Sequence, residues 1–168
     1  MSTPKFTDEP GQESRYRHLF NSIQDAVVEL EIIDGEPIVR SVNPAFEDVF
    51  GYAPADIQGE SLNDFIVPDE YEDEAADLDS RTSHGKYNNA VLTRATADGE
   101  REFLYRGVPY VQGGSRYAFA IYSDITDQKQ REAELERKNQ QLDECASILT
   151  HDLRNPINIA EGYLDQLD

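Results

Sequence analysis

Apolar and polar residues recur with clear periods in the first part of the chain, and these periods predict a helix followed by a hairpin. Apolar residues are spaced as on one face of a helix from 13 to 23. The segment AVVELEII at 26–33 alternates as a strand does, and Asp34-Gly35 is a turn sequence leading into PIVRSV. We therefore expect an amphipathic helix and then an antiparallel pair of strands.

Capping residues predict a second helix directly after this hairpin. Asn43 is a good N-cap, Pro44 suits the first helical position, and Gly51 is a typical stop. Short helical turns are predicted at 53–57 and 61–65, each with few apolar positions. These short elements are expected to wrap around a core.

An acidic helix and three strands are predicted next. Residues 69–79 include seven acids and one thin apolar stripe, which predicts a helix that lies on the core with its acidic back in solvent. Strands are predicted at 86–96, 101–110 and 115–126. Both faces of the last strand are apolar, so it should be central in the sheet, with the helix at 13–23 as cover for one face.

The composition changes after residue 126 to a run of helix formers without glycine or proline. A heptad frame with Asn139 at an a position predicts a parallel, dimeric coiled coil, because a buried Asn fixes register and two-strandedness. Its d positions are Leu135, Leu142, Leu149, Pro156 and Tyr163. A single helix packed on its own domain is the alternative.

Charge narrows the classes of partner. The 168 residues carry a net charge of −19, from 34 acidic against 15 basic residues spread over the whole chain. Nucleic acids and anionic membranes need a basic footprint that is not visible here. The excess of acids is typical of proteins in molar salt, where screening is strong, although an ordinary acidic protein is the alternative. Equal stability in low salt and in molar KCl would contradict the halophilic interpretation.

The sequence also lacks the features of membrane-spanning, secreted, disulfide-linked and metal-binding proteins. No apolar run reaches the ~18–20 residues of a membrane span, and the polar start is unlike a signal peptide, so we expect a cytoplasmic protein. Cys145 is alone and cannot form an intramolecular disulfide. With three histidines apart from one another, no metal site is expected.

Two groups of residues resemble the PAS sensor family. They are Asn43-Pro44-Ala45-Phe46 with Phe50-Gly51-Tyr52 and Gly59, and later Asp124-Ile125-Thr126, similar to the family's terminal D-I-T. The resemblance implies an α+β fold over 13–126, after a flexible start at 1–12: a five-stranded antiparallel sheet in the order 2-1-5-4-3 with helices enclosing a cavity or a plain core. It also implies that Asp124, Ile125 and Thr126 relay signals to the following helix, a coiled-coil segment at 127–147.

A second resemblance lies near the C-terminus. His151-Asp152-Leu153-Arg154-Asn155-Pro156 is similar to the H-box of sensor histidine kinases, which makes 148–168 the first part of a phosphoacceptor helix. The resemblance implies that His151 accepts phosphate, with Asp152 and Asn155 beside it. The chemistry of these residue types fits that role. The imidazole of His151 is a good nucleophile, and the neighbouring carboxylate of Asp152 can stabilise the imidazolium that forms. Asn155 is four residues after His151 and so lies on the same face of a helix.

The 168 residues lack the glycine-rich patterns of an ATP site. We therefore expect no autonomous kinase activity from what looks like a truncated product or a fragment. ATP would be used by a kinase domain not present here, and a response regulator receiver domain would be a further partner of the homodimer.

Cofactor signals are weak. The flavin-binding relatives use a cysteine that residues 60–65 lack, and no histidine lies on the acidic helix where haem-binding relatives have one; His84 is in a turn. Flavin and haem are thus disfavoured, and an apolar small molecule is the remaining hypothesis for the ligand. Its pocket would be formed by Phe46, Phe50, Phe65, Leu92, Phe103, Tyr105, Ala118, Ala120 and Tyr122. Simple core packing explains the same pattern.

The sequence therefore favours a sensory module of a two-component histidine kinase. The alternative is a stand-alone PAS adaptor, or a small-molecule-binding protein without kinase activity. The signal itself cannot be read from the sequence.

Overall fold

The computed structural model describes the backbone of residues 10–167 and the side chains of residues 11–150. The chain divides between Thr126 and Asp127 into two units. The second unit consists of the long helix α6 (Thr126–Leu167), which begins with the last residue of the first. The helices of the first unit are α1 (Pro10–Ser22), α2 (Pro44–Phe50), α3 (Pro54–Ile57), α4 (Asn63–Ile66), the 3₁₀ turn η1 (Asp69–Tyr71) and α5 (Glu72–Ser83).

The first unit is built on an antiparallel sheet of five strands in the order β2-β1-β5-β4-β3, which confirms the predicted topology. The strands are β1 (Ala26–Ile33), β2 (Glu36–Val42), β3 (Asn88–Thr96), β4 (Gly99–Gln112) and β5 (Ser115–Asp124). β5 is central, as its two apolar faces predict.

The turn and capping residues predicted from the sequence are found at the β1–β2 turn and at both ends of α2. Asp34 and Gly35 both have positive φ, 52° and 80°, which the tight turn between β1 and β2 requires. The Asn43 side chain caps α2 by accepting a hydrogen bond from the Phe46 backbone N–H at 3.0 Å. Gly51 ends α2 in the left-handed conformation, with φ 81°.

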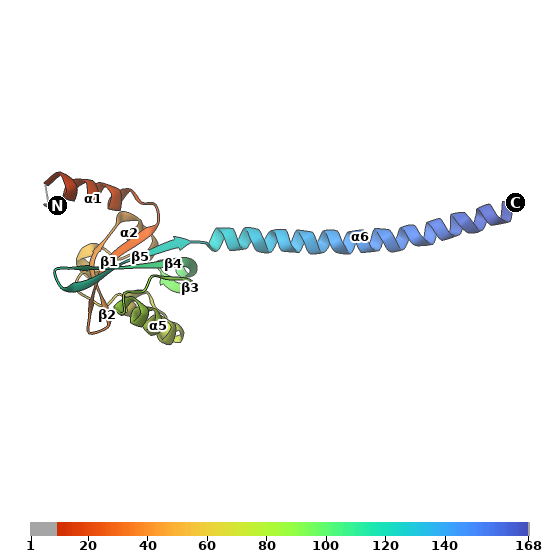
Figure 1. Ribbon diagram of the computed structural model, residues 1–168. Helices are drawn as coiled ribbons and strands as arrows, with labels where there is room; N and C mark the ends of the chain where they lie inside the picture. The colour runs from red at the N-terminus through yellow and green to blue at the C-terminus, as the bar shows by residue number, and fades with distance from the viewer. Residues whose placement is uncertain (1–9, 168) are drawn as a thin grey trace, which may run out of the picture. The chain divides into compact units, whose positions relative to one another are not determined.

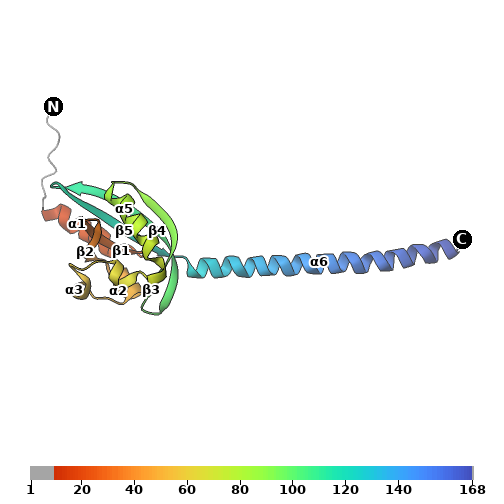
Figure 2. The same ribbon diagram turned by 90° about the horizontal axis from the view of Figure 1, so that it is seen from below.

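The two faces of the sheet have different covers (Figure 1): α1 lies on one side and α5 on the other. In Figure 2, seen from the α5 side, α5 lies in front of the strands. On this inner face Phe50 stacks on Phe103 at 5.4 Å between ring centroids and meets Tyr122 edge-on at the same distance. On the outer face the Tyr16 ring of α1 lies 6.2 Å from Phe119 of β5. The predicted role of the first helix as cover for β5 is confirmed.

Some boundaries differ from prediction. α1 begins at Pro10, inside the expected lead-in 1–12, and β4 extends over Gly99–Gln112, beyond the predicted 101–110. β5 ends at Asp124, two residues before the predicted end. β5 ends where the Asp124 side chain accepts a hydrogen bond from the Thr126 backbone N–H, two residues on.

Candidate functional site

The exit from β5 is a hydrogen-bonded turn. The Asp124 carboxylate accepts a hydrogen bond from the Thr126 backbone N–H at 2.9 Å, the local bond that aspartate often makes at turns. Arg101 of β4 donates to the other oxygen of Asp124 at 3.1 Å. The Ile125 N–H donates to the Glu102 carbonyl at 3.1 Å, so the turn is also joined to the backbone of β4.

Charge in this turn favours the ionised aspartate. Partial burial acts to raise the pKa of the Asp124 carboxyl, but the hydrogen bonds from Thr126 and Arg101 outweigh it and the pKa falls below its ordinary value of 3.8. The predicted relay residues Asp124, Ile125 and Thr126 thus form one bonded unit with Arg101 and Glu102, two β4 residues that sequence reasoning did not single out.

The predicted ligand-pocket residues lie on the inner face. Phe46, Phe50, Phe103 and Tyr122 are buried against one another, Leu92 belongs to the same core, and Ala118 is buried on β5. Phe65 lies at the edge, edge-on to Tyr52 with ring centroids 5.0 Å apart.

The space left among these inner residues is small. Tyr105, Ala120 and Tyr122 line a cavity of about 20 Å³. That volume accommodates about one water molecule, so a planar ligand would need the surrounding side chains to move.

One wall of this small cavity is polar. Arg94 of β3 is only 3% exposed and donates to Glu74 of α5 at 2.9 Å, while its Nε has no partner. Asn63 of α4 donates to Asp79 of α5 at 2.6 Å.

The expectation that the acids of 69–79 all lie on a solvated back is therefore wrong for Glu74 and Asp79. Asp79 lies four residues after the buried Ala75, so helical periodicity alone places it on the inner stripe.

Asp79 gives this wall a pH dependence. Burial raises the pKa of its carboxyl from 3.8 to about 6, although the Asn63 bond and the Arg94 charge oppose the shift. Since the folded state prefers the protonated form, this contribution to stability is complete below the unfolded pKa of 3.8. It is lost as the pH rises through about 6.

We expect Asp79→Asn to be more stable than the wild type by about 1–3 kcal/mol at pH 8, with little difference near pH 4. The neutral amide keeps an acceptor for Asn63 without a buried charge. Urea unfolding at both pH values measures the difference. The control is Asp77→Asn, whose carboxylate on the same helix is exposed and forms an ion pair with Arg81. A gain for Asp79→Asn that is equal at pH 4 and pH 8 would show that burial of the charge is not its cause.

The candidate phosphoacceptor residues His151, Asp152 and Asn155 lie outside the residues whose side chains the structure describes. The backbone there is part of α6. Earlier in α6, the d-position residues Leu135, Leu142 and Leu149 are 60%, 65% and 59% exposed in the single chain. The heptad stripe is therefore uncovered up to residue 150.

Two further kinds of site were sought in the described part of the chain. No helix there combines the length and apolarity needed to cross a membrane. Within the same residues, no three His, Cys, Asp or Glu side chains gather closely enough to hold a metal ion.

Comparison with known proteins finds a matching family and a similar sensor protein. Residues 14–84 match the model of the PAS domain family. Sensor protein FixL of Bradyrhizobium diazoefficiens is 24% identical over 167 residues, covering 91% of this chain and 32% of FixL. The chain thus spans about a third of the length of this curated relative.

Solved structures share the architecture. An RNA-binding light-oxygen-voltage receptor superposes with a TM-score of 0.65 at 17% identity, over 84% of this chain and 40% of that one. A domain of a sensory box sensor histidine kinase/response regulator from Geobacter sulfurreducens gives a TM-score of 0.55 at 22% identity, over 70% of this chain and 99% of that one. At these identities the solved structures establish the fold alone.

Proposed function

We propose that the chain is the sensory and relay segment of a two-component sensor histidine kinase, because residues 14–84 match the PAS domain family and the chain is similar to a sensor protein. In this proposal the PAS domain detects a small ligand or partner, and Asp124, Ile125 and Thr126 pass the change to α6. A coiled-coil homodimer presents His151 to an ATP-bearing kinase domain and then to a response regulator receiver domain. The excess of acids suits a cytoplasm of high salt.

The observation that carries the proposal is the bonded turn at the end of β5. Asp124 holds the backbone N–H of Thr126, the first residue of α6, while Arg101 holds Asp124 from the neighbouring strand. A shift of β4 against β5 changes the Arg101–Asp124 pair and the Ile125–Glu102 backbone bond together. A state of the sheet can therefore bias the start of the helix, which is the requirement for a two-state relay.

The helix supports the dimeric part of the proposal. A second copy of α6 would bury the stripe of Leu135, Leu142 and Leu149, with Asn139 at an a position of the seam. The heptad frame assigns His151 to position f, which is not one of the a and d positions of the seam. Phosphate transfer could then proceed without opening the dimer.

The test supplies ATP and the ATP-binding domain of a histidine kinase in trans and measures the rate of phosphate uptake by the full chain. We expect Asp124→Ala to lower the rate about fivefold, because losing a charged hydrogen bond of about 1 kcal/mol loosens the start of the helix. Asp127→Ala removes a neighbouring acid that does not join the strands and should stay within about twofold of wild type. Equal rates for Asp124→Ala and wild type would contradict the relay.

The alternative function is a PAS adaptor or small-molecule-binding protein without phosphate transfer. The similarity to a light-oxygen-voltage receptor over 84% of this chain fits that alternative equally well. A wild-type chain that forms dimers and takes up no phosphate in the same assay would favour it.

A further inference from the structure

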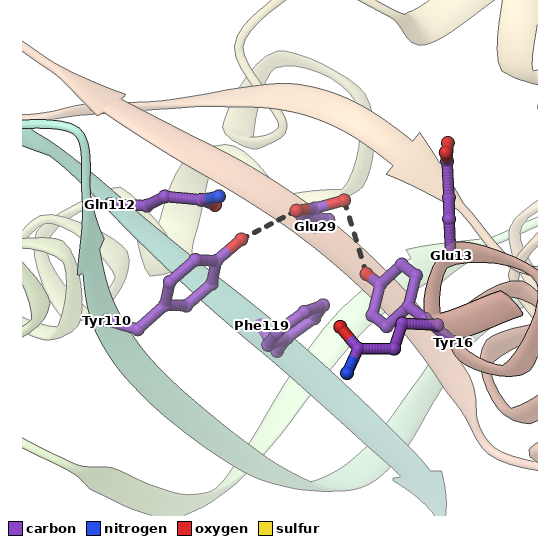
Figure 3. A pocket seen from close by; sticks show the side chains of 7 residues that line it. Glu13, Tyr16, Glu29, Tyr110, Gln112 and Phe119 are labelled. Atoms are coloured by element: carbon purple, nitrogen blue, oxygen red, sulfur yellow. Dashed lines mark hydrogen bonds between the residues drawn. The ribbon is translucent and has the colours of Figure 1, made fainter. Parts of the chain in front are cut away.

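A pocket of about 560 Å³ lies on the outer face of the sheet, between α1 and strands β1, β4 and β5. Figure 3 shows its construction: Tyr16 and Tyr110 stand on opposite sides, Phe119 lies between them, and dashed lines join Glu29 to both tyrosine hydroxyls. Glu13 of α1 is also among the lining residues and pairs with Arg17 at 3.5 Å. The volume is within the range of small-molecule sites.

The Glu29 carboxylate is almost fully used as a hydrogen-bond acceptor. Tyr110 donates to one oxygen at 2.6 Å, and Tyr16 and Ser41 donate to the other at 3.3 Å and 2.9 Å. Burial, together with Glu29, raises the pKa of both tyrosines, so their hydroxyls remain protonated donors at ordinary pH. A carboxylate offers about four lone-pair sites, and three are occupied.

The negative charge of Glu29 has no cationic counterpart in the described residues. None of the ion pairs there includes Glu29, and no Lys, Arg or His lines the pocket. The three donors are neutral hydroxyls, so they meet the hydrogen-bonding capacity of the Glu29 oxygens but do not neutralise the carboxylate charge.

The walls of the pocket are aromatic. The Tyr110 ring stacks on Phe119 at 5.2 Å with an interplanar angle of 20°, and the Tyr16 ring lies 6.2 Å from Phe119 at 50°. Ring faces carry partial negative charge and attract cations within about 6 Å of the centroid. The pocket therefore combines three aromatic rings with an uncompensated carboxylate.

We propose that this pocket binds an organic cation of the quaternary ammonium class. Such a head group carries positive charge but has no N–H groups, so it needs no free acceptor from Glu29. A primary ammonium has three N–H groups and a guanidinium five, and Glu29 has about one lone-pair site left, so these cations would lose more hydrogen bonds to water than Glu29 can replace. The proposal does not depend on phosphate transfer to His151.

The experiment titrates the full chain with choline or tetramethylammonium and follows the N-methyl proton NMR signal. Stacking over aromatic rings moves this signal upfield, which a purely structural role of the pocket would not do. We expect saturable binding about tenfold tighter than that of methylammonium or of 3,3-dimethylbutan-1-ol, the neutral analogue of choline. Binding of the neutral analogue that equals that of choline, or no saturable shift with choline, would overturn the proposal.

Variants assign the binding to this pocket. Glu29→Gln keeps the shape and removes the charge, and Tyr110→Leu removes a ring; each should weaken choline binding about tenfold. Tyr110→Phe keeps the ring and should bind within about threefold of wild type. Tyr87→Leu changes an exposed tyrosine elsewhere and is the matched control.

The variant results decide as follows. Wild-type affinity in folded Glu29→Gln would overturn the proposal. If circular dichroism shows that Glu29→Gln is unfolded, the difference between Tyr110→Leu and Tyr110→Phe decides instead, and equal binding by the two overturns it.

Discussion

Replacing Asn43 with aspartate is expected to lower the free energy of unfolding at pH 7 by about 4 kcal/mol. Asn43 is fully buried, and its Oδ1 accepts from the backbone N–H groups of Val27 and Phe46. Its Nδ2 donates to the carbonyls of Asp25 and Ile23 at 2.9 and 3.3 Å. The aspartate keeps both acceptor bonds but turns a buried negative oxygen toward two carbonyls.

Urea unfolding at pH 7 measures this loss, and Asn89→Asp, an exposed position on β3, is the control, with an expected change below about 0.5 kcal/mol. The loss should shrink as the pH falls, because a protonated aspartate regains one donor. A loss for Asn43→Asp as small as that of Asn89→Asp would mean that these four hydrogen bonds do not hold α2 to β1.

The features that the sequence predicted well depend on neighbours along the chain. The Asp34-Gly35 turn and the Asn43 to Gly51 helix need only local backbone conformations and short-range hydrogen bonds, so their residue types are informative by themselves. The central place of β5 also followed from its own residues, because both faces had to be buried. Sheet order came from the family resemblance.

The features that the sequence did not predict depend on contacts between distant segments. Glu29 and Tyr110 are hydrogen-bonded although 81 positions separate them, and neither residue type signals the other. Arg94 is buried because Glu74 of another element neutralises it, which composition cannot show. The outer pocket therefore emerged only once α1, β1 and β4 were placed together.

Replacing the proposed phosphoacceptor His151 is expected to have the other large effect, a loss of phosphate uptake. In transfer from ATP, an imidazole nitrogen attacks the γ-phosphorus, a P–N bond forms, the bond to the bridging oxygen breaks and ADP leaves. A glutamine amide has no comparable nucleophilic lone pair. We expect His151→Gln to lower phosphate uptake at least about a hundredfold. His18→Gln and His84→Gln replace the other two histidines and should leave uptake unchanged.

The central claim is that a PAS domain delivers its signal to a helix whose His151 accepts phosphate. Mapping of phosphate by mass spectrometry at alkaline pH, after incubation of the full chain with ATP and a histidine kinase's ATP-binding domain, tests it most directly. The account predicts acid-labile phosphate on His151 of the wild type and none on His151→Gln. A wild-type chain without phosphate, or equal phosphate on wild type and His151→Gln, would contradict it.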